Sequence, residues 1–125
     1  MPPYYVVDRI NVSGDEPNGA SVDAALSANG RYAAFASAAT NLVPGDGNGA
    51  TDVFVRDLQS GVIVRVSVDS AGVEGGGDSS EPSMSNDGRF VAFLSDHEFV
   101  NEDENGVTDA YVHDRDIDGD GTFDE

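Results

Sequence analysis

The sequence is an internal repeat, and this feature limits the possible folds more than any other. Residues 27–37 match residues 85–95 at an offset of 58, with six of eleven positions identical. Residues 46–57 match residues 103–114 at an offset of 57, with seven of twelve positions identical. A chain that repeats a unit of this length is expected to fold as repeated supersecondary structures.

A third match extends the repeat over nearly all of the 125 residues. Residues 6–12 correspond to residues 62–68 at an offset of 56. Short runs rich in Val, Ile, Phe and Tyr alternate with Asn-Gly, Asp-Gly and Ser-Gly pairs, which is typical of strands joined by tight turns. Residues 62–68 alternate apolar residues with Arg65 and Ser67, as expected for an outer strand with one wetted face. No segment keeps a helical periodicity, so the sequence predicts an all-β fold.

Each copy orders its parts as strand, turn, strand, acidic loop, strand, turn and outer strand. That order describes a four-stranded antiparallel meander, the repeating unit of a propeller blade. The chain resembles the TolB-like (WD-type) β-propeller repeat in PSMSNDGRFVAF at residues 82–93, TDVFVRD at 51–57 and RVSV at 65–68. The resemblance covers most of both copies and implies a propeller fold. It implies no activity, because propellers host many unrelated functions.

The number of predicted strands has a consequence for assembly. The predicted strands divide the chain into three parts. These are an outer strand within residues 1–13, a first blade at 14–69 and a second blade at 70–125 that lacks its own outer strand. Two blades cannot close a propeller, which usually has about four to eight. If residues 6–12 of one chain complete the second blade of a neighbour, the contact is head to tail and can close into a ring. The family resemblance favours a six-bladed homotrimer. Rings of two or four chains, and an excised piece of a longer propeller, are the alternatives.

The C-terminal residues carry the sharpest candidate for a binding site. Asp116, Asp118, Asp120 and Asp124 occupy positions 1, 3, 5 and 9 of a loop with glycine at position 6, like the start of an EF-hand-type calcium loop. The Thr122 carbonyl can add a ligand. The glutamate of position 12 would fall beyond the last residue, so the loop resembles the short acidic calcium loops of dockerins and thrombospondin repeats. We predict Ca²⁺ here; the alternative is a solvated acidic tail.

A weaker candidate occurs once in each copy, at Asp46, Asn48 and Asp52 and at the matching Asp103, Asn105 and Asp109. Oxygen ligands at this spacing could hold a structural cation. Asp and Asn are also the ordinary residues of Asx-turns, and this second interpretation is favoured. A metal stoichiometry above one per chain would support the cation.

Other residues recur at matched positions in the two copies. Arg31 and Arg89 precede the second strand of each copy, where we expect them to pair with local carboxylates. Aromatic residues recur at three positions, Tyr32/Phe90, Phe35/Phe93 and Phe54/Tyr111. Matched aromatics of this kind favour core packing between blades.

Composition disfavours several classes of function. The chain has 24 acidic and 6 basic residues, a net charge of -18 and no lysine, which disfavours binding to nucleic acids and anionic membranes. The absence of cysteine excludes disulfides and thiol chemistry. Neither His97 nor His113 lies in a nucleophile elbow or a recognisable triad pattern. The sequence therefore predicts a protein that is not an enzyme.

The function expected from these observations is a binding or scaffold module that is stabilised by calcium and assembles with itself. One alternative is a propeller accessory domain of a larger hydrolase or peptidase. Another is a carbohydrate-binding propeller, which the lack of Trp disfavours. Calcium loops of modest affinity belong to roughly the weakest class of such sites, and they fill only where the calcium concentration is near millimolar. We therefore expect an extracytoplasmic location. Residues 1–4 lack a basic region followed by an apolar stretch, so either the protein stays inside the cell or a signal peptide has been removed.

Overall fold

The computed structural model describes residue 10 and residues 18–42, 50–68, 78–96 and 108–124. Its strands are β1 (Ser21–Leu26), β2 (Tyr32–Ser37), β3 (Asp52–Asp57), β4 (Ile63–Arg65), β5 (Ser79–Met84), β6 (Phe90–Ser95) and β7 (Asp109–Asp114). β1 to β4 form one antiparallel sheet in sequence order, the first sheet, and β5 to β7 form a second sheet in the same way. The predicted all-β class and the two antiparallel meanders are confirmed. No helix in the described part of the chain is long and apolar enough to cross a membrane.

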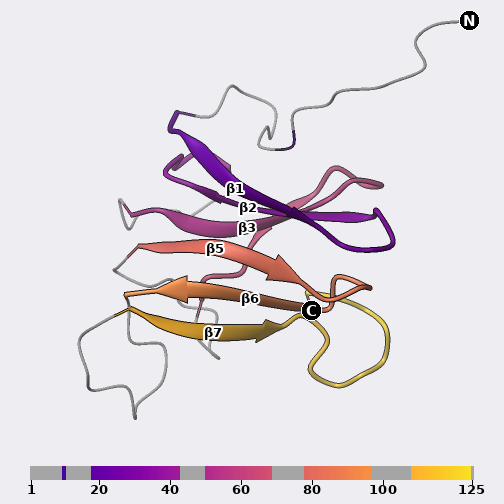
Figure 1. The fold of residues 1–125 in the computed structure, drawn as a ribbon. Helices are drawn as coiled ribbons and strands as arrows, with labels where there is room; N and C mark the ends of the chain where they lie inside the picture. The colour runs from indigo at the N-terminus through magenta and orange to yellow at the C-terminus, as the bar shows by residue number, and fades with distance from the viewer. Residues whose placement is uncertain (1–9, 11–17, 43–49, 69–77, 97–107, 125) are drawn as a thin grey trace, which may run out of the picture.

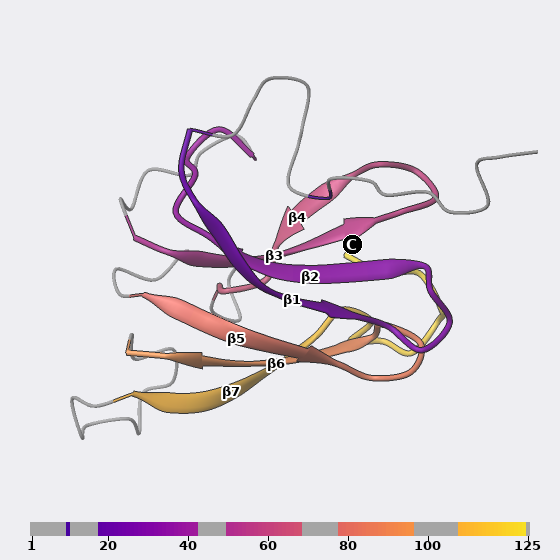
Figure 2. The same ribbon diagram turned by 45° about the horizontal axis from the view of Figure 1, so that its top comes forward.

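The two sheets lie face to face as layers (Figures 1 and 2). β5 lies against β1, β2 and β3 of the first sheet. The core between the sheets is formed by buried apolar side chains, namely Tyr32, Ala34, Val53, Val55, Val66, Val91 and Phe93. Successive residues of a strand point to opposite faces of its sheet, so the residues that alternate with these core residues form the other face of each sheet. β2 is buried at all six positions, which means that both of its faces are covered.

A second buried cluster lies on the opposite face of the first sheet. It comprises Phe35, Ala39, Leu42, Phe54 and Ile63. The rings of Phe35 and Phe54 lie 5.7 Å apart. Ile10, the one described residue of the predicted N-terminal strand, packs against this cluster.

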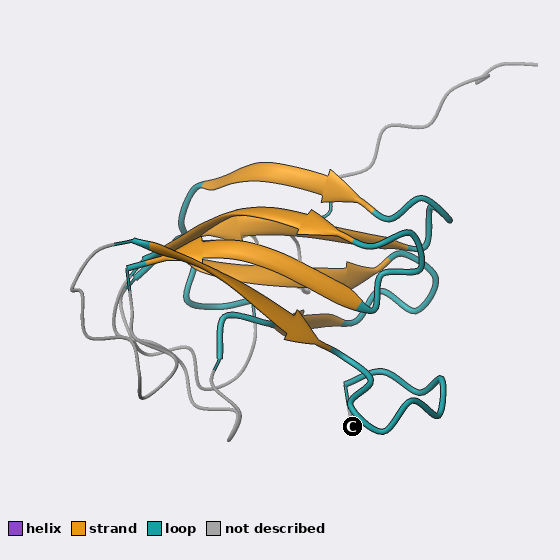
Figure 3. Cartoon of the chain, turned by 60° about the horizontal axis from the view of Figure 1, so that its bottom comes forward, coloured by secondary structure: helices purple, strands orange, loops and turns teal. Residues whose placement is uncertain are grey.

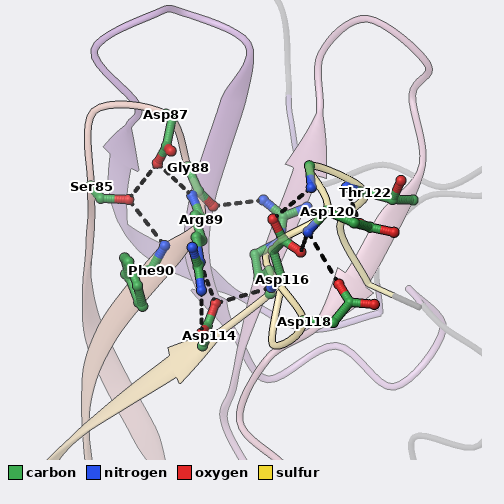
Figure 4. A network of polar contacts seen from close by, with 12 residues as sticks. Ser85, Asp87, Gly88, Arg89, Phe90, Asp114, Asp116, Asp118, Asp120 and Thr122 are labelled. Carbon is green, nitrogen blue, oxygen red and sulfur yellow. Dashed lines mark hydrogen bonds and ion pairs between the residues drawn. The ribbon is translucent and has the colours of Figure 1, made fainter.

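The turn between β5 and β6 shows why the repeated Ser-x-Asx-Gly-Arg pattern forms a tight hairpin (Figure 4). The Ser85 hydroxyl accepts the Phe90 N–H and donates to the Asp87 carboxylate, which also accepts the Arg89 N–H. Gly88 has a φ of +80°, a conformation that glycine adopts without strain. The first copy repeats this pattern through the hydroxyl of Ser27 and the side-chain oxygen of Asn29.

The first strand of each sheet contains an irregularity that the sequence did not predict. The register between β1 and β2 shifts after Val22, and the register between β5 and β6 shifts after Ser80. Asp23 and Glu81, which are equivalent in the repeat, adopt positive φ values of 58° and 53° at these shifts. A bulge of this kind increases the local twist of a strand.

β4 is shorter than the outer strand predicted at residues 62–68. After Arg65 the chain still follows β3, because the Val66 N–H donates to the Val53 carbonyl at 2.8 Å. The Val53 N–H in turn donates to the Ser67 hydroxyl at 3.1 Å, so a side chain replaces a backbone acceptor of the ladder. Ser67 is fully buried, and this end of the segment therefore lacks the wetted face that the sequence predicted.

Candidate metal centre

The C-terminal loop begins where β7 ends, and it projects beyond the end of that strand (Figure 3). Asp114 closes β7 and holds the start of the loop. Its carboxylate receives two hydrogen bonds from the Arg89 guanidinium, at 2.7 and 2.9 Å, and a third at 3.0 Å from the Asp116 N–H. The Arg115 N–H donates to the Arg89 carbonyl at 3.0 Å. The loop therefore has a defined position relative to the β5–β6 turn.

Three of the predicted ligands lie together in this loop. Asp116, Asp118 and Asp120 each offer a carboxylate oxygen, and these oxygens lie within 4.8 Å of one another. Asp116 is buried, whereas the other two are exposed. No other group of three or more potential metal-ligating His, Cys, Asp or Glu residues was found within the described segments. Clustered carboxylates repel one another, so a hard divalent cation would stabilise this arrangement.

Backbone amides of the loop fix the carboxylates in place (Figure 4). The Asp116 carboxylate accepts the Asp120 N–H at 3.1 Å and the Gly121 N–H at 2.9 Å. Asp118 also accepts the Asp120 N–H, and Asp120 accepts the Thr122 N–H at 2.7 Å. Each carboxylate thus turns the chain back on itself, as Asx-turn residues do, and their side chains converge.

Asp124 lies in a different environment from the other predicted ligands. Its carboxylate makes two hydrogen bonds with the Arg115 guanidinium, at 3.0 and 2.6 Å, and its N–H donates to the Arg115 carbonyl. The structure does not place Asp124 in the group of three carboxylates. Thr122 is exposed beside the group, and the role of its carbonyl as a ligand stays a prediction.

Arg115 and Phe123, which the sequence motifs did not indicate, connect the acidic loop to the core. The Arg115 side chain is 3% exposed, and its guanidinium lies 4.5 Å from the centre of the Tyr32 ring and 5.0 Å from that of Phe123. It also donates to the Gly88 carbonyl at 2.9 Å. The Tyr32 and Phe123 rings are 5.6 Å apart. An arginine and an aromatic at the two ends of an acidic loop are the signal that could have indicated this clamp.

The described part of the weaker candidate has a structural role. Asp46, Asn48, Asp103 and Asn105 lie outside the described residues. Asp52 begins β3, is 1% exposed and accepts a hydrogen bond from the Ser67 hydroxyl at 2.9 Å. Asp109 begins β7 opposite Ser95, as Asp52 begins β3 opposite Ser37. A cation at these positions stays a prediction.

Two arginine–aspartate pairs recur between the copies, as the sequence predicted. The Arg31 guanidinium holds the pKa of Asp57 down at about 2, and the Arg89 guanidinium holds the pKa of Asp114 at about 2. The predicted pairing of these arginines with local carboxylates is therefore confirmed. Burial lowers the pKa of the nearby His113 imidazole below 6.5, which favours its neutral form. His97 lies outside the described residues.

Comparisons with known proteins find similarity among solved structures. No protein-family model matches the sequence, and no curated protein matches it. Among solved structures, the chain is similar to TolB from Acinetobacter baumannii, with 23% sequence identity and a TM-score of 0.49. The match covers 85% of this chain and 20% of the TolB chain. The chain thus spans a small part of the length of the protein it matches.

Proposed function

We propose that this protein is a non-enzymatic β-propeller-type scaffold or binding module that Ca²⁺ stabilises and that assembles with itself. The observation that carries the proposal is the acidic loop, which brings three carboxylates together and is tied to the core between the two sheets. The assembly we propose is a head-to-tail homotrimer with six blades, in which the N-terminal strand of each chain completes the second sheet of a neighbour.

Calcium is favoured over other cations by the ligands and by their setting. Carboxylate and carbonyl oxygens are hard ligands, and Ca²⁺ accepts six to eight of them in flexible geometry. Asp116, Asp118 and Asp120 supply three, and water or the Thr122 carbonyl can supply others. The loop keeps two of these carboxylates exposed, which suits a site of modest affinity. Such a site fills at the high calcium concentrations outside the cytoplasm, so we propose an extracytoplasmic location.

The contacts of Phe123 explain how a surface cation would stabilise the whole protein. Phe123 and Arg115 pack on Tyr32, which belongs to the core between the sheets. A cation that orders the loop would therefore also hold the two sheets together. The expected gain in the free energy of unfolding is about 2.7 kcal/mol when calcium is about 100 times its Kd.

Calcium titration of variants tests the metal site. Asp118→Asn removes one carboxylate from an exposed position, so we expect calcium affinity to fall by about tenfold or more while calcium-free stability is kept. Asp96→Asn is the matched control, because Asp96 is also exposed but lies at the other end of β6. Isothermal titration calorimetry measures the calcium affinity of both variants, and thermal unfolding measures the rise in Tm that calcium causes in each. An equal response of the two variants would exclude Asp118 as a ligand, and a melting temperature that chelation leaves unchanged would remove calcium from the proposal.

Light scattering tests the assembly. A trimer has three times the 13.0 kDa mass of the chain, and we expect this mass with calcium and a smaller one with a chelator. A mass of 13.0 kDa under both conditions would exclude the ring. The search for function would then turn to a longer propeller that includes these two sheets.

A further inference from the structure

The second sheet carries an apolar face that is open to solvent. Phe90 is 40% exposed and Val112 is 65% exposed. Ala110 is exposed, and Ala92 and Leu94 are half-buried. The register pairs Ala92 with Val112 and Leu94 with Ala110, so these five side chains share one face of β6 and β7. We call this the open face.

The same face of the first sheet is buried. The residues equivalent to the open face are Tyr32, Ala34, Ala36, Val53 and Val55, of which Tyr32 is 7% exposed and the other four are 0% exposed. What covers this face is the second sheet. In the first copy this face packs against a neighbouring sheet. In the second copy the equivalent face is exposed.

Ile10 indicates where the complementary surface lies. It is equivalent to Val66, which packs in the core between the sheets together with Phe93 of the second sheet. Ile10 packs against the buried cluster on the opposite face of the first sheet, which contains Phe35, the equivalent of Phe93. The Arg56 guanidinium also donates to the Ile10 carbonyl at 3.3 Å. Ile10 thus occupies the position on the first sheet that Val66 occupies on the second. This is where the outer strand of another sheet, packed before the first sheet in a propeller, would lie.

We infer that the open face binds a second copy of this chain, on the side of its first sheet where Ile10 packs. The inference deepens the proposed self-assembly and rests on it, because it names the two surfaces that meet. The occupant follows from the chain itself, in which the equivalents of these two surfaces already pack against each other. Different surfaces meet in this contact, so it is heterologous and can be repeated around a ring.

A charge placed on the open face tests the inference. Val112→Asp puts a carboxylate at the centre of the proposed interface, and we expect self-association of the full chain to weaken by about a hundredfold or more, because the contact would bury an unpaired charge. Val62→Asp is the matched control, since Val62 is 58% exposed and lies in the turn before β4, away from the open face. Sedimentation velocity over a range of concentrations measures the mass. Circular dichroism and melting of the monomers should show that both variants fold.

The absence of cysteine allows a second measurement on the assembled protein. Val112→Cys should react slowly with a maleimide when the chain is assembled and quickly when dilution separates the copies. Val62→Cys should react quickly in both cases. A disulfide between two Val112→Cys chains would show that the open face binds itself, which would overturn the inference.

The outcomes separate this inference from the proposed self-assembly. If the parent chain is a trimer and Val112→Asp assembles equally well, the open face is not the interface, while self-assembly stands. If the parent chain has a mass of 13.0 kDa at every concentration, both are overturned. A trimer that Val112→Asp converts to monomers, and that Val62→Asp leaves intact, supports both.

Discussion

Gly30 and Gly88 occupy the same turn in the two copies but have different surroundings. Both have positive φ, +73° and +80°. A Cβ atom on Gly30 would meet nothing within 4 Å, whereas one on Gly88 would meet the Tyr32 side chain, with Cγ at 3.0 Å and Cβ at 3.2 Å. The first glycine is therefore needed for its backbone conformation, and the second also for the close contact of the two sheets.

Alanine at each of these glycines should separate the two effects. We expect Gly30→Ala to lower the free energy of unfolding by about 1–2 kcal/mol, the cost of a left-handed conformation for a residue with a side chain. Gly88→Ala should lower it by roughly 1–3 kcal/mol more, because the Tyr32 ring must move. Urea unfolding of both variants measures the difference. Equal losses would show that the core tolerates a methyl group beside Tyr32.

Arg89 controls the titration of Asp114. With the pKa of Asp114 at about 2 in the folded chain and ordinarily 3.8, this pair stabilises the fold above pH 3.8 and the stabilisation is lost as the pH falls toward 2. In Arg89→Gln, we expect the pKa of Asp114 to rise toward 3.8, since the charge-assisted hydrogen bonds are gone. Carboxyl carbon NMR measures it. Arg31→Gln is the internal control, because it should release Asp57 and leave Asp114 unchanged.

At the scale of elements, the C-terminal loop combines two separate structures. Asp116, Asp118 and Asp120 form a group of carboxylates, whereas Arg115 and Asp124 form an ion pair that closes the loop. A cation would relieve the repulsion within the group, whereas the pair neutralises a nearly buried guanidinium. Loss of a carboxylate should therefore affect calcium-free stability differently in the two places.

Asp124→Asn should destabilise the calcium-free chain by about 1–3 kcal/mol, because it leaves the Arg115 guanidinium without its anionic partner. Asp118→Asn should change calcium-free stability by less than about 0.5 kcal/mol, as exposed substitutions usually do. Thermal unfolding in a chelator measures both. If Asp124→Asn is as stable as the parent, the clamp does not hold the loop on the core.

For the whole molecule, the net charge of -18 opposes a compact chain. Salt screens this repulsion, since the Debye length falls to about 10 Å at 0.1 M. We expect the calcium-free chain to gain about 1 kcal/mol between low salt and 0.5 M, which raises Tm by roughly 3–5 °C. Sodium and choline chloride should act equally. A rise with sodium alone would indicate specific binding of a cation instead of screening.

The sequence by itself determined the local structure of each copy. Short apolar runs and the Ser-x-Asx-Gly-Arg turns specify antiparallel strands through contacts between near neighbours, and the same turn contacts recur in both copies. The spacing of Asp116, Asp118 and Asp120 likewise predicted their convergence, because a short loop brings alternate residues together. The positive φ of Asp23 and Glu81 was not predictable, since neither residue type marks a bulge.

Only the tertiary structure decided which equivalent residues are buried. Tyr32 is 7% exposed and Phe90 is 40% exposed, although the two occupy the same position of the repeat, because a second sheet covers one and not the other. Asp124 was expected at the cation site, but Arg115 binds it, and the position of Arg115 depends on the Tyr32 ring across the sheet interface. Burial and pairing of this kind depend on residues far apart in the chain, and a local repeat carries no information about which neighbour is present.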